Sequence, residues 1–382
     1  MIRREKGFTL VELMITMVIF VVVIAAVSQI FTGLLTQFKQ QSKMAETNIE
    51  GIVGLEMMRR DVERAGYGIP WVIPATAAAY NEVPLPDTTP GFDYNECAGA
   101  CTAVPRPVVA GSGAGFNGSD EFVIRATNVA RNTSSQAWTI LSAGDVKTNG
   151  LSGESFANTD RVIVLSPGNS AANARTLVVS SADNTVWRTT YNATANFDPA
   201  DATQTFVIYG VAPDDGGAAL RMPFNRTDYY ISNSNPPLRC AANTGVLIKS
   251  VLSQSSGASG GTRTDFLPLL DCVADMQIVF RFDQTVPPDG VADIVTDGIA
   301  ATGLTAQQVR ERLMDIRVYI LAHEGQRDPN FTYATNPVYV GDAAVGGGRN
   351  FNFTTVPNPI TDWQNYRWKI YTIVVVPKNL KQ

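Results

Sequence analysis

The distribution of apolar residues sets the N-terminal part of the chain apart from the rest. Between Phe8 and Leu35 nearly every residue is apolar, and Glu12 is the only charged one. Basic residues precede this run at positions 3, 4 and 6. A helix of about 20 apolar residues spans the core of a bilayer, and flanking basic residues favour the cytoplasmic side. The pattern predicts a single membrane-spanning helix. A carboxylate in lipid is costly, so Glu12 needs a partner.

After Gln37 the pattern becomes that of an amphipathic helix. Apolar residues recur there at spacings of three and four, which places them in one stripe: Ala45, Ile49, Ile52, Leu55, Met58, Val62 and Ala65. Gly66, Gly68 and Pro70 give a stop signal. We expect one helix from Phe8 to Ala65, about 87 Å long at 1.5 Å per residue, whose second half packs on a domain. Three glycines are expected weak points, each costing about 1 kcal/mol relative to alanine: Gly33, Gly51 and Gly54.

The remainder of the chain alternates between β-type runs and turn-rich loops, which predicts a β-rich domain and an α+β fold. An irregular stretch is expected over 72–110. The expected strands cover 121–126, 161–165, 175–179, 186–191, 205–211, 229–231, 245–251, 275–282, 315–322 and 368–376. Thr305 and Gln308 have the spacing of a capping box, which predicts a short helix as far as Leu313.

Composition narrows the class of protein. The chain has 382 residues, a net charge of −5 and only 17% charged residues. No basic run follows Arg64, so the electrostatic footprint of a nucleic-acid-binding protein is missing from the sequence. The abundance of Gly, Pro, Asn, Thr and Ser is typical of an exported protein of strands and loops. We expect no nucleic-acid partner and no cofactor.

The four cysteines are Cys97, Cys101, Cys240 and Cys272. An even number in an exported domain indicates two disulfides, although four cysteines allow three pairings. We favour Cys97–Cys101, which closes a small loop, and Cys240–Cys272, which closes a longer one. The three residues between Cys97 and Cys101 and the lack of a nearby histidine argue against haem attachment or a redox CxxC motif.

Three interpretations of the N-terminal segment compete. The first is a plain membrane anchor. The second is a cleaved signal peptide with a cleavage site near Ala26-Val27-Ser28, although its apolar region would be long. The third rests on Gly7-Phe8-Thr9-Leu10-Val11-Glu12-Leu13, which resembles the prepilin peptidase site of type IV prepilins. Gly7, Phe8, Glu12, the short basic leader and the long apolar helix together carry this resemblance, and it is the interpretation we favour.

The resemblance implies a role for each of these residues. Cleavage would fall between Gly7 and Phe8, and Phe8 would become an N-methylated N-terminus. Glu12 would then face the amine of Phe8 on a neighbouring subunit, because a carboxylate in a low-dielectric medium is stabilised by an ammonium group. The competing interpretation is that Glu12 only reaches the lipid headgroups from near the end of the helix. The implied division is a leader at 1–7, a transmembrane part at 8–35, an amphipathic part at 36–66 and a β-rich domain at 67–382.

Four further segments are similar to the PilW family of minor pilins: 58–67, 117–125, 272–280 with Asp289, Gly290 and Asp293, and 366–379. This resemblance implies a pilin-like α+β fold with a long N-terminal helix. The region 130–220 matches none of these segments, and we expect an inserted lobe there.

Several other patterns favour structural over functional explanations. Gly113-Ala-Gly115-Phe-Asn-Gly118 spells GxGxxG, but a strand is expected after it where a nucleotide site needs a helix, so a loop is predicted. Asp283, Asp289 and Asp293 are lesser candidates for a calcium site; the spacing fails the EF-hand pattern, and a surface turn is favoured. His323 is the only histidine, and we expect it to be satisfied or exposed. We therefore expect no metal site and no catalytic residues.

The favoured function is that of a minor pilin that assembles into or primes a type IV pilus. Expected partners are other pilins and minor pilins, the prepilin peptidase/N-methyltransferase and a pilus-tip adhesin. The expected location is the bacterial inner membrane, with the C-terminal domain in the periplasm, followed by the fibre. A minor pseudopilin of type II secretion is the close alternative. A membrane-anchored periplasmic enzyme is the alternative of a different class.

Overall fold

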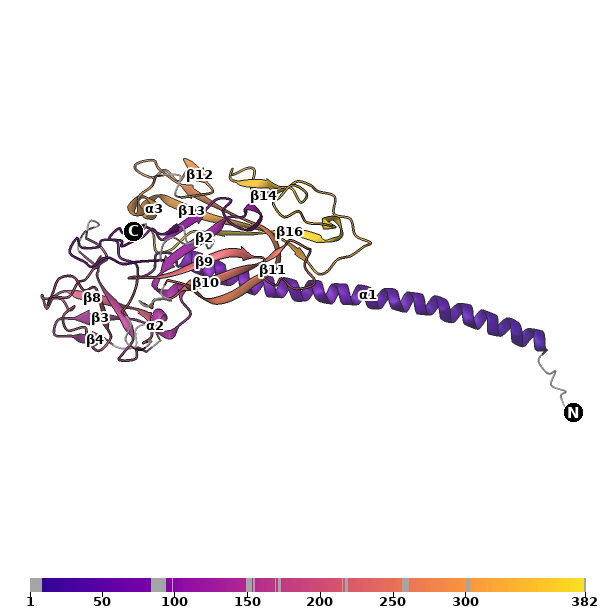
Figure 1. Cartoon of the computed structure of the whole chain (residues 1–382), viewed down its shortest axis with the longest axis horizontal. Helices are drawn as coiled ribbons and strands as arrows, with labels where there is room; N and C mark the ends of the chain where they lie inside the picture. Colours follow the sequence, from indigo (N-terminus) through magenta and orange to yellow (C-terminus); the bar gives the residue numbers. More distant parts are fainter. Residues whose placement is uncertain are drawn as a thin grey trace.

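The computed structural model describes residues 9–83, 94–97, 99–148, 153, 155–168, 170, 173–214, 216, 219–255, 261–299 and 303–380. One long helix, α1 (Leu10–Glu63), extends from a β-rich domain that encloses only its C-terminal part (Figure 1). Its 54 residues correspond to about 81 Å. Gly66 follows it with φ +79° and donates its N–H to the carbonyl of Arg125, so the chain turns off the helix onto the sheet. The predicted α+β fold is confirmed.

The main sheet is antiparallel and has eight strands in the order β1-β2-β9-β10-β11-β13-β16, with β12 beside β11. The strands are β1 (Val108–Gly111), β2 (Glu121–Ala126), β9 (Asn225–Ser232), β10 (Gly245–Leu252), β11 (Arg263–Phe282), β12 (Ile294–Thr296), β13 (Leu313–Glu324) and β16 (Arg367–Val375). The helix contacts β11, β13 and β16. Met58 and Val62 of α1 are fully buried in the same core as Phe122 and Phe280 of the sheet.

A second sheet of six strands lies apart from the first, at the end of the domain farthest from the helix N-terminus (Figure 1). Its order is β4-β3-β8-β5-β6, and β7 pairs with β5. The strands are β3 (Trp138–Ser142), β4 (Val146–Thr148), β5 (Arg161–Ser166), β6 (Thr176–Leu177), β7 (Arg188–Thr190) and β8 (Thr205–Ala212). All of them fall within the stretch 130–220. Buried Trp187 and Phe224 belong to a core shared with Ile69 and Trp71, just beyond α1.

Smaller elements complete the domain. The strands β14 (Val338–Gly341) and β15 (Gly348–Phe351) pair as a hairpin over an aromatic core that contains Phe353 and Trp363. The short helices are α2 (Thr133–Gln136), α3 (Ala306–Arg312), η2 (Phe116–Gly118), η3 (Thr127–Val129) and η5 (Trp363–Asn365). Thr305 caps α3 with Gln308 in the predicted capping box.

The amphipathic stripe was predicted too long. Leu55, Met58 and Val62 are buried as expected, but Ile49 and Ile52 are 65% and 59% exposed. The reason is geometric: Ile49 precedes the covered part of α1, which begins at about Gly51, and Ile52 lies off the helix face that the domain buries. The expectation that Gly51 and Gly54 weaken the helix stays a prediction, but the structure gives Gly54 a second role. An ideal Cβ on Gly54 would lie 2.0 Å from the carbonyl oxygen of Leu269, so the missing side chain is what allows the contact.

Candidate assembly site

The first turn of α1 is organised by Thr9 and Glu12. The Thr9 backbone N–H and hydroxyl donate to Glu12 Oε2 at 3.0 and 2.9 Å, and the Glu12 N–H donates to Thr9 Oγ1 at 3.3 Å. This capping box satisfies backbone donors that a helix N-terminus otherwise leaves open. Among the residues that the structure describes, none donates a hydrogen bond to Glu12 Oε1. The cap therefore holds the carboxylate towards the start of the chain and leaves one oxygen available. Gly7 and Phe8 lie outside the described residues.

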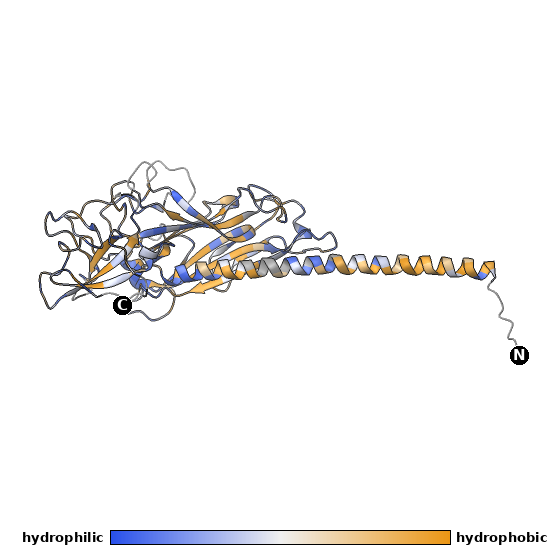
Figure 2. Cartoon of the chain, turned by 90° about the horizontal axis from the view of Figure 1, so that it is seen from below, coloured by the Kyte–Doolittle hydropathy of each residue, from blue (hydrophilic) through white to orange (hydrophobic). Residues whose placement is uncertain are grey.

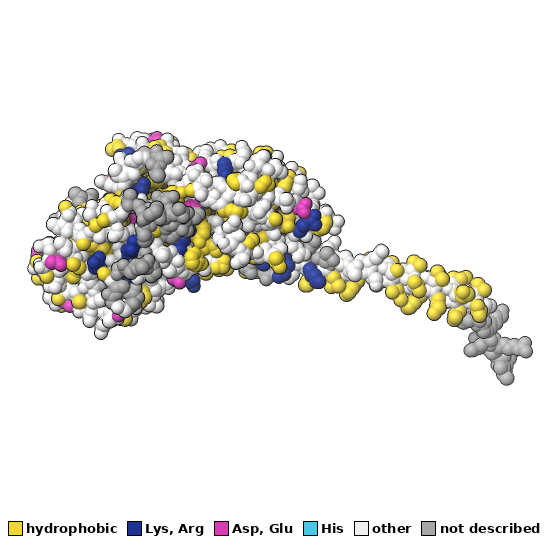
Figure 3. Space-filling model, in the orientation of Figure 1, with side chains coloured by type: hydrophobic (Ala, Val, Ile, Leu, Met, Phe, Trp, Pro, Cys, Tyr) yellow, Lys and Arg dark blue, Asp and Glu magenta, His cyan; other side chains and the backbone are white. Residues whose placement is uncertain are grey.

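The helix that follows presents an apolar surface with nothing packed on it. The span Leu10–Lys43 is long and apolar enough to cross a membrane, and none of its most apolar window is buried. Val11, Phe20 and Val27 are 63%, 65% and 59% exposed. Figure 2 shows this half of α1 as a nearly continuous apolar rod, and Figure 3 shows its apolar side chains projecting outward. A surface of this size needs lipid or other protein to cover it.

A second apolar feature is a groove where the helix meets the domain, separated from the apolar run by the mostly polar stretch 37–48. A cavity of about 520 Å³ lies between α1 and the first half of β11. Ile49, Val53 and Met57 line its helix side, and the run Leu267 to Asp271 lines its sheet side. Phe266, next to this run, is 59% exposed. Sequence reasoning missed this groove. The only hint in the sequence was the pair of small residues Gly51 and Gly54, spaced to lie on one face of the helix.

A buried polar contact fixes the helix on the sheet. Asp61 of α1 accepts a hydrogen bond from the hydroxyl of Tyr229 on β9 and forms an ion pair with Lys249 on β10. Asp61 and Lys249 are 8% and 3% exposed. Burial raises the pKa of Tyr229 and the Asp61 carboxylate raises it further, so the phenol stays protonated and donates. Because a buried charge needs its partner, this contact selects one position of the helix along the sheet.

The comparison with protein families concerns the N-terminal segment. Residues 2–28 match the family described as the prokaryotic N-terminal methylation motif. The N-terminal segment is type IV pilin-like. The match covers the basic leader, Gly7, Phe8, Glu12 and most of the apolar run. Comparisons with curated proteins and with solved structures gave no match to this chain.

The chain contains both expected disulfides, Cys97–Cys101 and Cys240–Cys272. Ligand atoms of Cys240, Cys272 and His323 lie within 4.8 Å of one another, but both sulfurs are engaged in the disulfide. His323 is buried on β13, accepts the Ala241 N–H at 2.9 Å and packs against Tyr366 and Trp368. Burial lowers the pKa of His323 to about 3, so its ring is neutral. The expectation of a satisfied or exposed histidine is met at Nε2 only, because Nδ1 is buried without a hydrogen-bond partner among the described residues.

The three aspartates form a turn. Asp283 accepts the N–H groups of Thr285 and Gly290 at 3.1 and 2.8 Å, and Asp293 accepts those of Gln284 and Thr285 at 2.6 and 3.0 Å. Asp289 accepts from Val291. Backbone donors thus use both oxygens of Asp283 and one oxygen each of Asp289 and Asp293. Within the described residues, the three do not converge as a metal-ligand cluster.

The GxGxxG stretch is also a turn. It links β1 to β2 through the three-residue η2, and the long helix that would bind a pyrophosphate does not follow it. The predicted loop is confirmed, and Gly113 and Gly118 there have φ of +68° and +76°.

Proposed function

We propose that this chain is a minor pilin, of the kind found in the PilW family, that assembles into or primes a type IV pilus through its N-terminal helix. The observation that carries the proposal is the uncovered apolar rod of α1 with Glu12 held in its first turn, in a segment that matches the methylation motif. The rod would bundle with equivalent helices of other pilins once it leaves the lipid. The groove beside β11 would add a second apolar contact surface on the domain.

Glu12 has a specific task in this proposal. After cleavage between Gly7 and Phe8, the new amine lies one residue before Thr9, which holds Glu12 Oε2. The other oxygen, Oε1, would accept the amine of Phe8 from a neighbouring subunit. In an apolar bundle such a pair is attractive, whereas an unpaired carboxylate is penalised. Pairing would therefore favour docking and fix the axial position of each subunit.

The partners and location follow from this role. The prepilin peptidase/N-methyltransferase would process the chain at the inner membrane, with the domain in the periplasm. Other pilins and a tip adhesin would then contact it in the fibre. The action is non-covalent in this proposal, not enzymatic. The sole histidine, His323, is a poor candidate for a general acid or base, because burial lowers its pKa to about 3, far from neutral pH.

The test measures how much of the Glu12→Gln variant enters the fibre. This substitution keeps the size and capping capacity of the side chain but removes its charge. We expect normal membrane insertion and at least a tenfold loss of the subunit from sheared fibres, since about 1.4 kcal/mol is a factor of ten and a broken buried pair costs about 3–5 kcal/mol. Glu56→Gln, on the same helix but in exposed ion pairs, is the matched control and should be incorporated normally. Wild-type incorporation of Glu12→Gln would refute the pairing.

Processing is tested separately by mass spectrometry of the exported chain. We expect an N-methylated mature chain that begins at Phe8, and Gly7→Val should keep the leader attached. A mature chain that begins near Gln29 would instead indicate a signal peptide.

Deleting the gene separates the remaining alternatives: loss of pili supports the pilin, loss of protein secretion with normal pili supports the pseudopilin, and loss of a hydrolytic activity alone supports the enzyme.

A further inference from the structure

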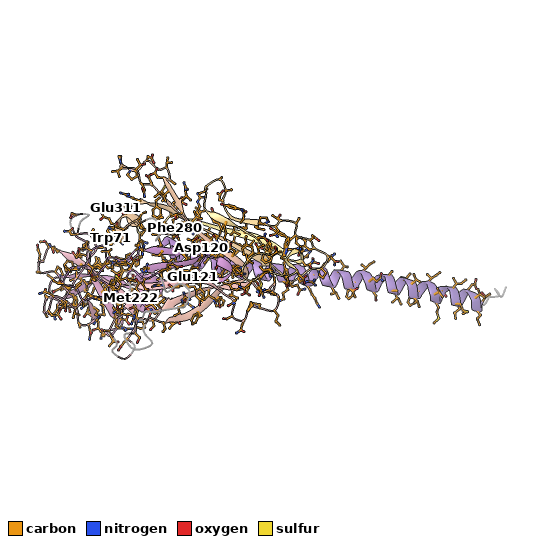
Figure 4. All side chains as sticks on the ribbon, turned by 45° about the horizontal axis from the view of Figure 1, so that its top comes forward. Trp71, Asp120, Glu121, Met222, Phe280 and Glu311 are labelled. Atoms are coloured by element: carbon orange, nitrogen blue, oxygen red, sulfur yellow. A yellow bond between two sulfur atoms is a disulfide. The ribbon has the colours of Figure 1, made fainter. Side chains whose placement is uncertain are left out.

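A second cavity lies at the end of the molecule opposite the N-terminus of α1. It has a volume of about 570 Å³. Its wall includes Trp71, just beyond α1, together with Arg106 and, from α3 and its cap, Thr305, Ala306 and Arg310. Figure 4 labels Trp71 and Glu311, the neighbour of Arg310, at this end, far from the apolar rod. A ligand here would therefore not compete with packing of the helix.

The cavity contains one arginine, Arg310, that no carboxylate pairs within the described residues, because the carboxylate in its wall, Glu96, binds Arg106 and Arg125. Arg310 is 7% exposed, and its guanidinium lies 4.3 Å from the centre of the Trp71 ring. Arg175 lies at the same distance from that ring. Within the described part of the chain, neither arginine has a carboxylate within 4 Å. Arg106 differs, because Glu96 binds it at 3.0 Å.

Two further observations indicate a missing acceptor. Burial lowers the pKa of Arg310; Glu311 opposes this effect, and the charge of Arg175 adds to it. The indole Nε1 of Trp71 is buried and has no hydrogen-bond acceptor among the described residues. Buried donors without acceptors are uncommon in folded proteins, because each costs about 1–3 kcal/mol. The indole of Trp71 is one such donor, and it lies at the same cavity as the Arg310 guanidinium, so an anion there could accept from both.

We propose that this cavity binds a carboxylate side chain of a partner polypeptide. A guanidinium presents two parallel N–H groups that match a carboxylate, and stacking on Trp71 holds that fork in place. Ala103, Val104 and Ala306 line the same cavity and suit the short apolar stem of an aspartate or glutamate. The site stands on its own observations and does not depend on the function proposed above.

The test uses the full chain in detergent with ¹⁵N-labelled tryptophan. The probes are the capped tripeptides acetyl-Gly-Glu-Gly-amide and acetyl-Gly-Gln-Gly-amide, glutarate and inorganic phosphate, all at equal ionic strength. We expect the Glu peptide to shift the Trp71 indole signal saturably and the Gln peptide to leave it unchanged. Arg310→Gln should weaken binding of the Glu peptide at least tenfold. Arg188→Gln is the matched control, because Arg188 also stacks on a tryptophan but lies outside the cavity.

A second variant tests the site even if Arg310→Gln fails to fold. Ala306→Glu places an acid at the first position of α3, where a helix N-terminus favours a negative charge. The new carboxylate should pair with Arg310 and abolish peptide binding, and the substitution removes no packing. Equal binding of the Glu and Gln peptides, or binding that survives both variants, would overturn the site. If inorganic phosphate binds as tightly as the Glu peptide, the choice of a carboxylate as ligand is overturned. If glutarate binds as tightly as the Glu peptide, the choice of a polypeptide as partner is overturned.

Discussion

At the scale of single residues, two glycines determine how closely α1 approaches the sheet. Gly54 lies against the backbone of Leu269, and an added Cβ would meet that carbonyl oxygen at 2.0 Å. At Gly51 the same atom would meet two side chains, Leu270 Cδ1 at 2.9 Å and the Tyr371 hydroxyl at 3.9 Å. A flexible side chain can move aside more easily than a backbone carbonyl. Gly54 is therefore the stricter of the two positions.

This difference predicts the effect of Gly54→Ala. Alanine is the better helix former by about 1 kcal/mol, yet overpacking typically costs about 1–3 kcal/mol. An approach of 2.0 Å to a backbone carbonyl puts the overpacking cost near the upper end of that range. After the helix-propensity gain is subtracted, we expect the free energy of unfolding of the domain to fall by about 2 kcal/mol, measured by denaturant titration in detergent. Gly33→Ala is the control, since nothing lies within 4 Å of the point that an added Cβ would occupy there, and it should leave domain stability unchanged. Equal stability of both variants would contradict the contact.

The ion pair between Asp61 and Lys249 gives a second prediction at this scale. Lys249→Met should cost about 3–5 kcal/mol of unfolding free energy, because it leaves the Asp61 carboxylate buried without a cation. The double variant Asp61→Asn, Lys249→Met should recover much of that loss, since neither charge then remains. Arg60→Met is the control, because Arg60 belongs to an exposed pair with Glu56, which is worth about 1 kcal/mol or less. A double variant no better than Lys249→Met would contradict the coupling.

At the scale of elements, the sequence pattern was most informative where local signals agree. The strand at 121–126 was predicted with its observed bounds, and the capping box at Thr305 was confirmed. At 121–126 residue type and alternation both favour a strand, and at Thr305 the capping chemistry favours the start of a helix. The helix was predicted from Phe8 to Ala65 and is observed from Leu10 to Glu63. Its length follows from uninterrupted helical periodicity and the glycines that follow it.

Elements that depend on distant partners were missed. The first half of β11, which contains Pro268 and positive φ at Asp265 and Cys272, has no strand-like pattern. It becomes a strand because β10 pairs with it across several register shifts. The strand β3 was missed for the same reason, since its partner β8 lies far along the chain. The strands β4 and β14 belong to local hairpins with β3 and β15, and they are too short for an alternating pattern to stand out.

The candidate sites divide in the same way, because a site signalled by neighbours in sequence was predicted and sites formed by distant segments were not. Glu12 was identified because its neighbours in sequence carry the signal. The groove of Ile49 and Leu267 and the cavity of Trp71 and Arg310 each join segments that are more than 200 residues apart. A single sequence shows each of these residues as an ordinary apolar or basic one. Only folding brings them together.

At the scale of the whole molecule, a buried ion network joins the segment after α1 to the main sheet. Glu82 binds Arg125 of β2 at 2.8 Å and Arg226 of β9 at 3.0 Å. Glu82 is 4% exposed and both arginines are fully buried. Burial opposes ionisation of Glu82, but Arg125 and Arg226 outweigh it and hold the pKa of that carboxyl below its usual value. The folded state therefore needs Glu82 charged.

Asp120 behaves in the opposite way. It lies in the turn before β2 and accepts the N–H groups of Gly113 and Ile278 at 2.9 and 2.8 Å. Burial raises the pKa of Asp120 to about 7 despite these two bonds, and the carboxylates of Asp275 and Asp297 add to the rise. The folded state thus favours a protonated Asp120 at mildly acidic pH.

These two groups together predict how stability depends on pH. The pKa of Glu82 is lower in the folded chain than in the unfolded one, so its contribution is present above about pH 4.5 and is lost as the pH falls. The pKa of Asp120 is higher when folded, so its contribution is present below about pH 3.8 and is lost as the pH rises towards 7. The free energy of unfolding should peak near pH 4–5 and decline up to about pH 7, with a slope of up to about 1.4 kcal/mol per pH unit for one group.

Asp120→Asn tests this assignment, because an amide cannot ionise. We expect the decline between about pH 5 and pH 7 to flatten in denaturant titrations, even though the amide loses one backbone hydrogen bond and lowers stability overall. Asp201→Asn is the control: that exposed carboxyl has its pKa lowered by the backbone and hydroxyl of Thr203, so its replacement should alter stability only at more acidic pH. A decline as steep in Asp120→Asn as in the wild type would assign the effect to other groups, of which Asp275 comes first because burial raises its pKa as well.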